Sequence, residues 1–222
     1  MGSGIDPREP HAGQPVLTGG PHPADARVTM ILLHGRGASA EDILALALEI
    51  GLDDVAYLAP QARGNTWYPY SFLAPLAQNE PGISSAFGVL SRLIDSLDAR
   101  GMDAQRVGFL GFSQGACLAL EYAARHARRY AGVFALSGGL IGPPGTPRNY
   151  AGSFGATPVF LGCSDVDAHI PLERVRESAE VFRRMEANVD ERIYPRMGHT
   201  VNPDEIRAIN EILRPRQAEL SR

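Results

Sequence analysis

Short runs of apolar residues recur along this chain, and a segment with helical spacing separates most of them. Val28–Leu33 is the clearest run and suits a strand that is buried on both faces. The pattern predicts strands at 28–33, 55–59, 107–110, 132–136, 158–162 and 191–194, and helices at 40–50, 83–99, 114–124, 172–186 and 203–213. Strands joined through helices pair in parallel, because the crossover returns the chain to the same end of the sheet. We therefore predict an α/β fold with a mostly parallel central sheet and helices on both faces.

The region before the first of these strands differs in character. Residues 1–26 contain five prolines, which break helices and central strands, so an extended N-terminal segment is expected there. Residues 27–222 have the length of one globular domain and contain no internal repeat or long linker. We expect a single domain without a separate lid domain, because the stretch 138–155 is the one sizeable loop.

Charge and composition argue against several classes of partner and chemistry. A formal net charge of -4 supplies no basic surface for a phosphate backbone, so no nucleic-acid partner is expected. All 21 basic residues are arginine, which excludes reactions that need a lysine amine. No apolar stretch reaches the roughly 20 residues that span a bilayer, and the N-terminus lacks the features of a secretory signal. With only two cysteines, Cys117 and Cys163, the chain is expected to be cytoplasmic.

The segment Gly111–Gly115, with the sequence Gly-Phe-Ser-Gln-Gly, lies between a predicted strand and a predicted helix. This is the context of the G-x-S-x-G nucleophile elbow, in which a sharp turn projects a serine hydroxyl above the sheet. The flanking glycines leave room for neighbouring backbone. Ser113 is therefore the candidate nucleophile. A serine hydroxyl is a weak nucleophile, so a histidine base and an acid that orients it are also needed.

His199 is the candidate base, because it follows the last predicted strand through a glycine-containing loop. The rival base is His169, which lies too close in sequence to the proposed acid to face it well. The acid should follow the strand at 158–162, where Asp165 and Asp167 share one short loop. The residues alone favour Asp167 and leave Asp165 open. The chain order Ser, Asp, His is the one that hydrolases with this elbow use.

Acyl transfer also requires two backbone N–H groups that face the developing oxyanion. One should come from Gln114, the residue after the nucleophile. The second candidate is the Arg36 N–H, because Gly35 and Gly37 let the loop after the first strand turn its amides inward; a plain glycine turn is the alternative. His34 has no second ligand at useful spacing, so we expect a hydrogen-bonded structural histidine and no metal site.

Aromatic residues concentrate at 65–73, after the second predicted strand, and include the only tryptophan of the chain, Trp67. Aromatic loops often line apolar pockets, so Trp67 is the candidate substrate-binding residue. The alternative is that Trp67 and Phe72 only cover the core. The sequence leaves both alternatives open.

Together these segments resemble the phospholipase/carboxylesterase family of α/β-hydrolases, which includes acyl-protein thioesterases and bacterial carboxylesterases. The resemblance covers about residues 28–213 and rests on 33–37, on 111–115, on Asp167 with Ile170-Pro171, and on Gly198-His199-Thr200. In that family an aspartate stands four residues before the proline that opens the next helix, which selects Asp167 over Asp165. The resemblance also supports Arg36 and Gln114 as oxyanion donors. The stretch 162–167 is longer than is usual in the thioesterases, so the chain looks more like the bacterial small-ester branch.

These observations predict a serine carboxylesterase that hydrolyses small to medium carboxylic esters, or thioesters, through an acyl-enzyme. A small-molecule ester is the expected partner, and no cofactor is expected. Two alternatives remain. An acyltransferase or perhydrolase would pass the acyl group to another acceptor, and a hydrolase-fold binding module would hold a ligand without chemistry. The sequence is compatible with a homodimer but does not determine the oligomeric state.

Overall fold

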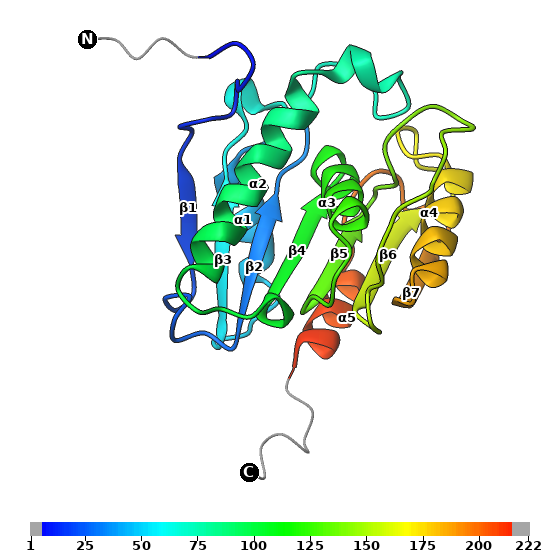
Figure 1. Ribbon diagram of the computed structural model, residues 1–222. Helices are drawn as coiled ribbons and strands as arrows, with labels where there is room; N and C mark the ends of the chain where they lie inside the picture. The colour runs from blue at the N-terminus through cyan, green and yellow to red at the C-terminus, as the bar shows by residue number, and fades with distance from the viewer. Residues whose placement is uncertain (1–5, 215–222) are drawn as a thin grey trace.

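A twisted β-sheet forms the centre of the molecule (Figure 1). The computed structural model describes residues 6–214. Its sheet has seven strands in the order β1-β3-β2-β4-β5-β6-β7. The strands are β1 (Val16–Gly19), β2 (Val28–Leu33), β3 (Val55–Pro60), β4 (Val107–Phe112), β5 (Gly132–Leu136), β6 (Pro158–Ser164) and β7 (Asn188–Tyr194). The α-helices within the described residues are α1 (Ala40–Leu48), α2 (Gly82–Asp98), α3 (Gln114–Arg125), α4 (Leu172–Arg184) and α5 (Pro203–Leu213).

Neighbouring strands pair in parallel except for β1, which is antiparallel to β3 with Val16 opposite Pro60. The predicted mostly parallel sheet is thereby confirmed. β1 is absent from the sequence prediction, although it lies within the residues 1–26 that were expected to be extended. Its side chains alternate between exposed and half-buried, as suits an edge strand, so it contains no continuous apolar run.

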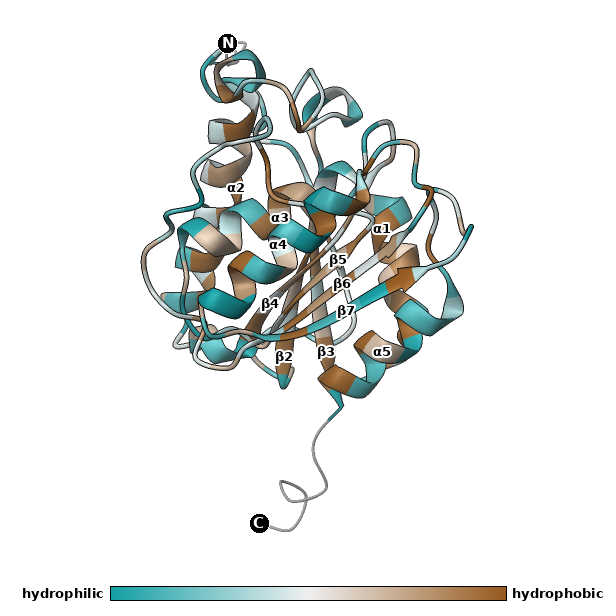
Figure 2. Ribbon diagram, turned by 90° about the vertical axis from the view of Figure 1, so that its right-hand side faces the viewer, coloured by the Kyte–Doolittle hydropathy of each residue, from teal (hydrophilic) through white to brown (hydrophobic). Residues whose placement is uncertain are grey.

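The inner strands are hydrophobic along most of their length, whereas the edge strand β7 is largely hydrophilic (Figure 2). Every residue of β2, β3 and β5 is buried, because helices cover both faces of the sheet at these strands. β7 has no fully buried residue. None of the helices within residues 6–214 combines the length and the apolar character needed to cross a bilayer.

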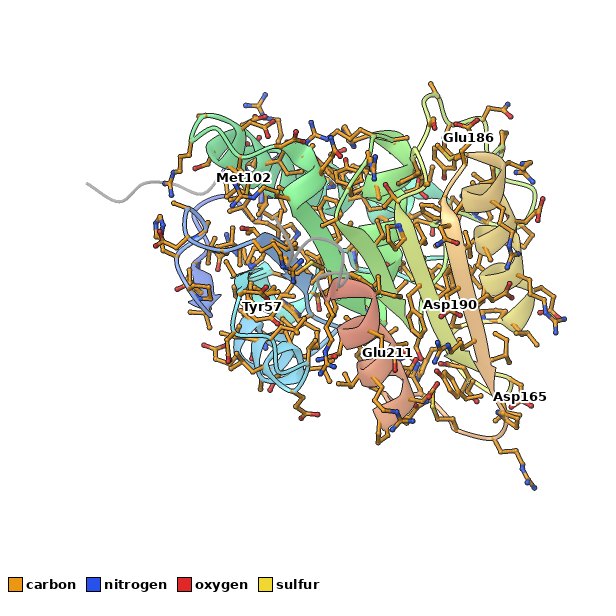
Figure 3. All side chains as sticks on the ribbon, turned by 90° about the horizontal axis from the view of Figure 1, so that it is seen from below. Tyr57, Met102, Asp165, Glu186, Asp190 and Glu211 are labelled. Carbon is orange, nitrogen blue, oxygen red and sulfur yellow. The ribbon has the colours of Figure 1, made fainter. Side chains whose placement is uncertain are left out.

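The helices form one layer on each face of the sheet. α1 and α5 pack on one face through a core that includes Ile43, Phe160 and Ile209. α2, α3 and α4 cover the other face. Figure 3 shows the division, with β6 and β7 lying between α5, which carries the labelled Glu211, and α4. The loops that follow the carboxyl ends of β2, β4, β6 and β7 meet at one edge of the sheet, the upper edge in Figure 1.

Candidate active site

Ser113 occupies a sharp turn between the end of β4 and the start of α3. Its backbone has φ 54° and ψ -117°, a combination that non-glycine residues rarely adopt and that persists only where the surroundings impose it. The Ser113 N–H donates a hydrogen bond to the Leu136 carbonyl at 2.9 Å. A Cβ on Gly115 would lie 2.0 Å from the Leu33 carbonyl oxygen, and one on Gly111 would lie 2.4 Å from the Gly115 backbone. Both glycines of the motif are therefore needed for α3 to pack directly on the sheet.

The substitution Gly115→Ala should destabilise the fold by at least about 3 kcal/mol, because the new methyl group meets backbone atoms of β2 that cannot move separately. Gly88→Ala is the matched control. Gly88 lies inside α2, its new methyl would meet only the end of the Arg92 side chain at 3.2 Å, and alanine should stabilise that helix by up to about 1 kcal/mol. Urea unfolding of both variants measures the two effects. Equal stability of Gly115→Ala and the wild type would contradict the close contact between α3 and β2.

Ser113, His199 and Asp167 form one chain of hydrogen bonds. The distance from Ser113 Oγ to His199 Nε2 is 2.8 Å, and that from His199 Nδ1 to Asp167 Oδ2 is 2.7 Å. The three residues follow β4, β7 and β6, so the parallel sheet brings them to one edge. Because a carboxylate only accepts hydrogen bonds, Nδ1 carries the proton and Nε2 can accept the serine hydroxyl.

The Asp167 carboxylate is completely buried and is held by several donors. Its Oδ1 accepts the backbone N–H groups of His169 at 2.8 Å and Ile170 at 3.0 Å, and the Cys163 thiol lies 3.7 Å from Oδ2. Burial raises the pKa of Asp167, but the hydrogen bonds from His199 and the two backbone N–H groups outweigh burial and hold the pKa below its usual 3.8. Asp167 is therefore ionised at neutral pH, as a partner of the imidazole must be.

Asp165, the other candidate acid, has different hydrogen-bond partners. Its Oδ1 accepts the Arg196 N–H at 2.7 Å, and the neighbouring Ser164 hydroxyl accepts the Gly198 N–H at 3.1 Å. Both contacts tie the end of β6 and the loop after it to the loop that carries His199. In Figure 3 Asp165 lies at the outer end of this region, beyond β6 and β7. Asp165 therefore supports the backbone of the His199 loop.

Two aromatic contacts of His199 were not predicted from the sequence. The ring centroid of Phe112 lies 5.0 Å from that of His199, with an interplanar angle of 37°. The ring of His169, the rival base, lies 4.7 Å away at 67°. These two rings restrict the orientation of the imidazole, in addition to its hydrogen bond with Asp167. His169 thus contacts the ring of His199, and it is His199 that makes the hydrogen bonds to Ser113 and Asp167.

The helix after the His199 loop begins with a reciprocal cap. Asn202 Oδ1 accepts the backbone N–H groups of Asp204 and Glu205, and Glu205 Oε2 accepts the Asn202 N–H at 2.8 Å. Glu205 is fully buried, and its Oε1 lies against Gly162 without a hydrogen-bond partner within the described residues. Burial raises the pKa of Glu205 to about 7, although the backbone hydrogen bond opposes the shift. A carboxyl group that titrates near neutrality thus lies beneath the His199 loop.

The raised pKa of Glu205 predicts a pH-dependent stability. Between pH 4.5, the usual pKa, and about pH 7 the folded chain binds more proton at this site than the unfolded chain, so stability falls as pH rises. Glu205→Gln keeps the acceptor for the Asn202 N–H but cannot ionise. Its stability relative to the wild type should increase by roughly 1–3 kcal/mol between about pH 5 and pH 8. Urea unfolding of both chains at the two pH values checks this. The contributions of the other titratable groups to the unfolding free energy are the same in both chains and cancel in the difference. A difference that does not change with pH would contradict the prediction.

The backbone N–H groups of Arg36 and Gln114 are free of hydrogen bonds to any residue between 6 and 214. Both residues line the same cavity as Ser113. The N–H of Gln114 belongs to the first turn of α3, where the helix supplies no acceptor, and the positive end of the helix dipole lies at the same place. The two N–H groups expected to bind an oxyanion are thus unpaired beside the serine.

The side chains of Arg36 and Gln114 anchor one loop, residues 67–70, a contribution that the sequence did not signal. The Arg36 guanidinium donates to the carbonyls of Tyr68, Pro69 and Tyr70 at 2.9, 2.8 and 2.6 Å. The buried Gln114 amide accepts the Trp67 N–H at 2.9 Å and donates to the Tyr68 carbonyl at 2.8 Å. Each residue therefore has an unpaired backbone N–H and a side chain that holds the aromatic loop in place.

A cavity of about 580 Å³ opens over Ser113, and we call it the serine cavity. Besides Ser113 and His199, its walls include Arg36, Tyr68, Tyr70, Phe72, Gln114, Cys117 and Ile170. Trp67 is not part of its lining. Trp67 is fully buried, and its indole N–H donates to the His34 carbonyl at 2.9 Å. The prediction that Trp67 contacts substrate is therefore wrong, because the tryptophan turns inward and covers the core while its neighbours face the cavity.

The remaining reactive side chains near the site are structural. Both ring nitrogens of His34 are engaged, with the Gly35 carbonyl at 2.8 Å and the Ala62 N–H at 3.0 Å. Burial raises the pKa values of Cys117 and Cys163 to about 12, so both remain protonated thiols at neutral pH. Neither cysteine can act as a thiolate nucleophile beside Ser113.

Comparison with known proteins identifies relatives of this chain. A model of the phospholipase/carboxylesterase family matches residues 21–216. The crystal structure of a phospholipase/carboxylesterase from Dyadobacter fermentans is 43% identical, covers 91% of this chain and 97% of its own, and superposes with a TM-score of 0.87. Acyl-protein thioesterase 1 of Gibberella zeae is 26% identical over 214 residues, 84% of this chain and 89% of that protein. NocK of Nocardia uniformis subsp. tsuyamanensis is 29% identical over 161 residues, 70% of this chain but only 44% of that protein's length.

The family match extends over nearly all of the described structure and includes the elbow, the Asp167 loop and the His199 loop. The α/β-hydrolase fold expected from the sequence is confirmed by the same match and by the similarity to the Dyadobacter fermentans structure. This chain therefore belongs to the phospholipase/carboxylesterase family of α/β-hydrolases, a family of serine hydrolases.

Proposed function

We propose that this chain is a serine carboxylesterase in which Ser113 is the nucleophile, His199 is the general base and acid, and Asp167 orients His199. The observation that carries the proposal is the unbroken chain of hydrogen bonds, 2.8 Å from Ser113 to His199 and 2.7 Å from His199 to Asp167. The ionised state of Asp167 adds to it, since a negative charge stabilises the imidazolium that forms during the reaction.

Acylation follows from these positions. His199 Nε2 takes the Ser113 proton as Oγ attacks the carbonyl carbon, and the negative charge that develops on the carbonyl oxygen is stabilised by the N–H groups of Arg36 and Gln114. The imidazolium then protonates the leaving oxygen or sulfur, whose bond to the carbonyl carbon breaks. Water, activated by the same histidine, hydrolyses the acyl-enzyme and restores Ser113.

The substrate we propose is a small to medium carboxylic ester, or a thioester of similar size. The serine cavity, at about 580 Å³, has the volume of a small-molecule site. Its walls combine the aromatic and aliphatic side chains of Tyr68, Phe72 and Ile170 with the unpaired N–H groups, which suits an apolar acyl chain attached to one polar carbonyl.

Active-site labelling tests the proposal. A fluorophosphonate probe should add one adduct to the wild type and none to Ser113→Ala, as measured by intact mass. Equal labelling of both chains would exclude Ser113 as the nucleophile, and no labelling of the wild type would favour a binding module. Product analysis with an added alcohol or peroxide then separates hydrolysis from acyl transfer. A predominance of new ester or peracid over free acid would identify an acyltransferase or perhydrolase.

A further inference from the structure

A second cavity, of about 740 Å³, adjoins the serine cavity. It lies between α1 and α5, which pack on the same face of the sheet, and we call it the α1–α5 groove. Apolar atoms make up most of its exposed lining, and its apolar side chains include Ile43 and Leu46 from α1, and Val201, Pro203 and Ile206 from the start of α5 and the residues before it. Four residues line both cavities, namely Gly35, Ala38, Phe112 and His199. The two spaces therefore meet at the imidazole of His199.

The reacting groups are divided unequally between the two cavities. Ser113, Arg36 and Gln114 line only the serine cavity, whereas His199 lines both. In the tetrahedral intermediate, the oxyanion faces the Arg36 and Gln114 N–H groups and the leaving atom faces His199 Nε2. The acyl group, which stays bonded to Ser113, belongs in the serine cavity. The leaving group is the one substituent whose position beside His199 gives it access to the α1–α5 groove.

We propose that the α1–α5 groove binds the alcohol or thiol part of the substrate and favours a neutral alkyl leaving group. This inference rests on the proposed esterase function. In the acylation step the Ser113 Oγ–carbon bond forms, the bond from carbon to the leaving oxygen or sulfur breaks, and the proton passes from Oγ to His199 Nε2 and then to the leaving atom. The alkyl chain on that atom extends over Leu46 and Ile206 on opposite walls of the groove.

Charged residues at the groove argue against an anionic leaving group. Asp42, Glu49 and Arg207 contribute to the lining. Arg207 is already paired with Asp204 at 3.0 Å, so it supplies no unpaired positive charge. Asp42 accepts hydrogen bonds from Ser39. The carboxylates of Asp42 and Glu49 leave the rim with negative charge. A phosphate-bearing alcohol or thiol would be repelled there, whereas a neutral chain would not.

Esters that share one acyl group and differ only in the alcohol test the proposal. For ethyl, butyl and hexyl butanoate, kcat/KM of the wild type should rise by about tenfold or more from ethyl to hexyl, because added methylenes enter the apolar groove. Hydrolysis of ethyl butanoate itself reports on the proposed esterase function and does not depend on the groove. A wild type that hydrolyses ethyl butanoate without preferring the hexyl ester would overturn the groove proposal alone.

Variants on the two walls localise the effect. Leu46→Trp should lower the hexyl-to-ethyl ratio of kcat/KM at least about fivefold, because the indole fills the space that the alkyl chain occupies. Leu48→Trp is the matched control, since Leu48 is 53% exposed on the same helix and lies outside the groove. Its ratio should equal that of the wild type. Ile206→Trp, on the opposite wall, should repeat the loss if Leu46→Trp does not fold. Ratios that stay at the wild-type value in both groove variants would overturn the proposal.

Discussion

Replacing Ser113 with alanine should lower kcat for the hydrolysis of ethyl butanoate by roughly 10⁶-fold, the scale of nucleophile loss in other serine hydrolases. The variant loses the Oγ that lies 2.8 Å from His199 and therefore cannot form an acyl-enzyme. The unpaired N–H groups of Arg36 and Gln114 remain. Some hydrolysis above the rate in buffer should persist, because oxyanion stabilisation and substrate binding do not need the serine. The measurement is kcat at saturating ester, with acid release followed by titration.

The control is Ser84→Ala, which removes an exposed hydroxyl from α2 and should leave kcat unchanged. Both variants should show the circular dichroism spectrum of the wild type, since Ser113 keeps its place through the hydrogen bond from its backbone N–H to Leu136. A Ser113→Ala protein that is folded and retains more than about one hundredth of the wild-type kcat would contradict the proposed nucleophile.

The sheet and its helices could be predicted from the sequence because their signals are local. β2 and β5 begin and end where the apolar runs do, and α5 begins at Pro203, the residue type most suited to the first turn of a helix. β1 gave no such signal. It has four residues, contains no continuous apolar run, and depends on its antiparallel pairing with β3, which no property of residues 16–19 indicates.

The residues of the site also differ in whether a local sequence signal predicts their placement. Ser113 could be predicted because its elbow requires glycines at fixed spacing. Any other residue at these two positions would place its Cβ 2.0 or 2.4 Å from neighbouring backbone atoms. Trp67 could not be placed, because an aromatic residue in a loop can face a pocket or the core with equal local propensity. Its inward orientation depends on a hydrogen bond from its indole N–H to the His34 carbonyl. His34 follows β2, whereas Trp67 follows β3, so no local sequence signal links the two residues. The burial of the Glu205 carboxyl group likewise could not be predicted, because it results from the packing of α5 against Gly162 of β6.

The choice between the two aspartates of one loop can be tested with a matched pair of variants. Asp167→Asn should lower kcat by roughly 10⁴-fold, the scale seen when the acid of such a triad becomes an amide. The asparagine can still accept the N–H groups of His169 and Ile170 through its oxygen. Its NH₂ group would then face His199 Nδ1 and donate to it. Nε2 would consequently carry the ring proton, and the imidazole could no longer accept the proton of Ser113.

Asp165→Asn changes the same chemistry two positions away and should lower kcat less than about threefold, because an amide oxygen can still accept the Arg196 N–H. The ratio of the two effects is more informative than either value. Loss of charge or general disturbance of the loop would affect both variants, whereas loss of the correct imidazole tautomer affects only Asp167→Asn. Burial of Asp167 should increase the difference in kcat between the two variants, because its side chain is inaccessible to solvent and no water can take the place of the carboxylate. If Asp165→Asn were the more damaging substitution, the acid would have to be reassigned and the 2.7 Å contact of Asp167 with His199 would have only a structural role.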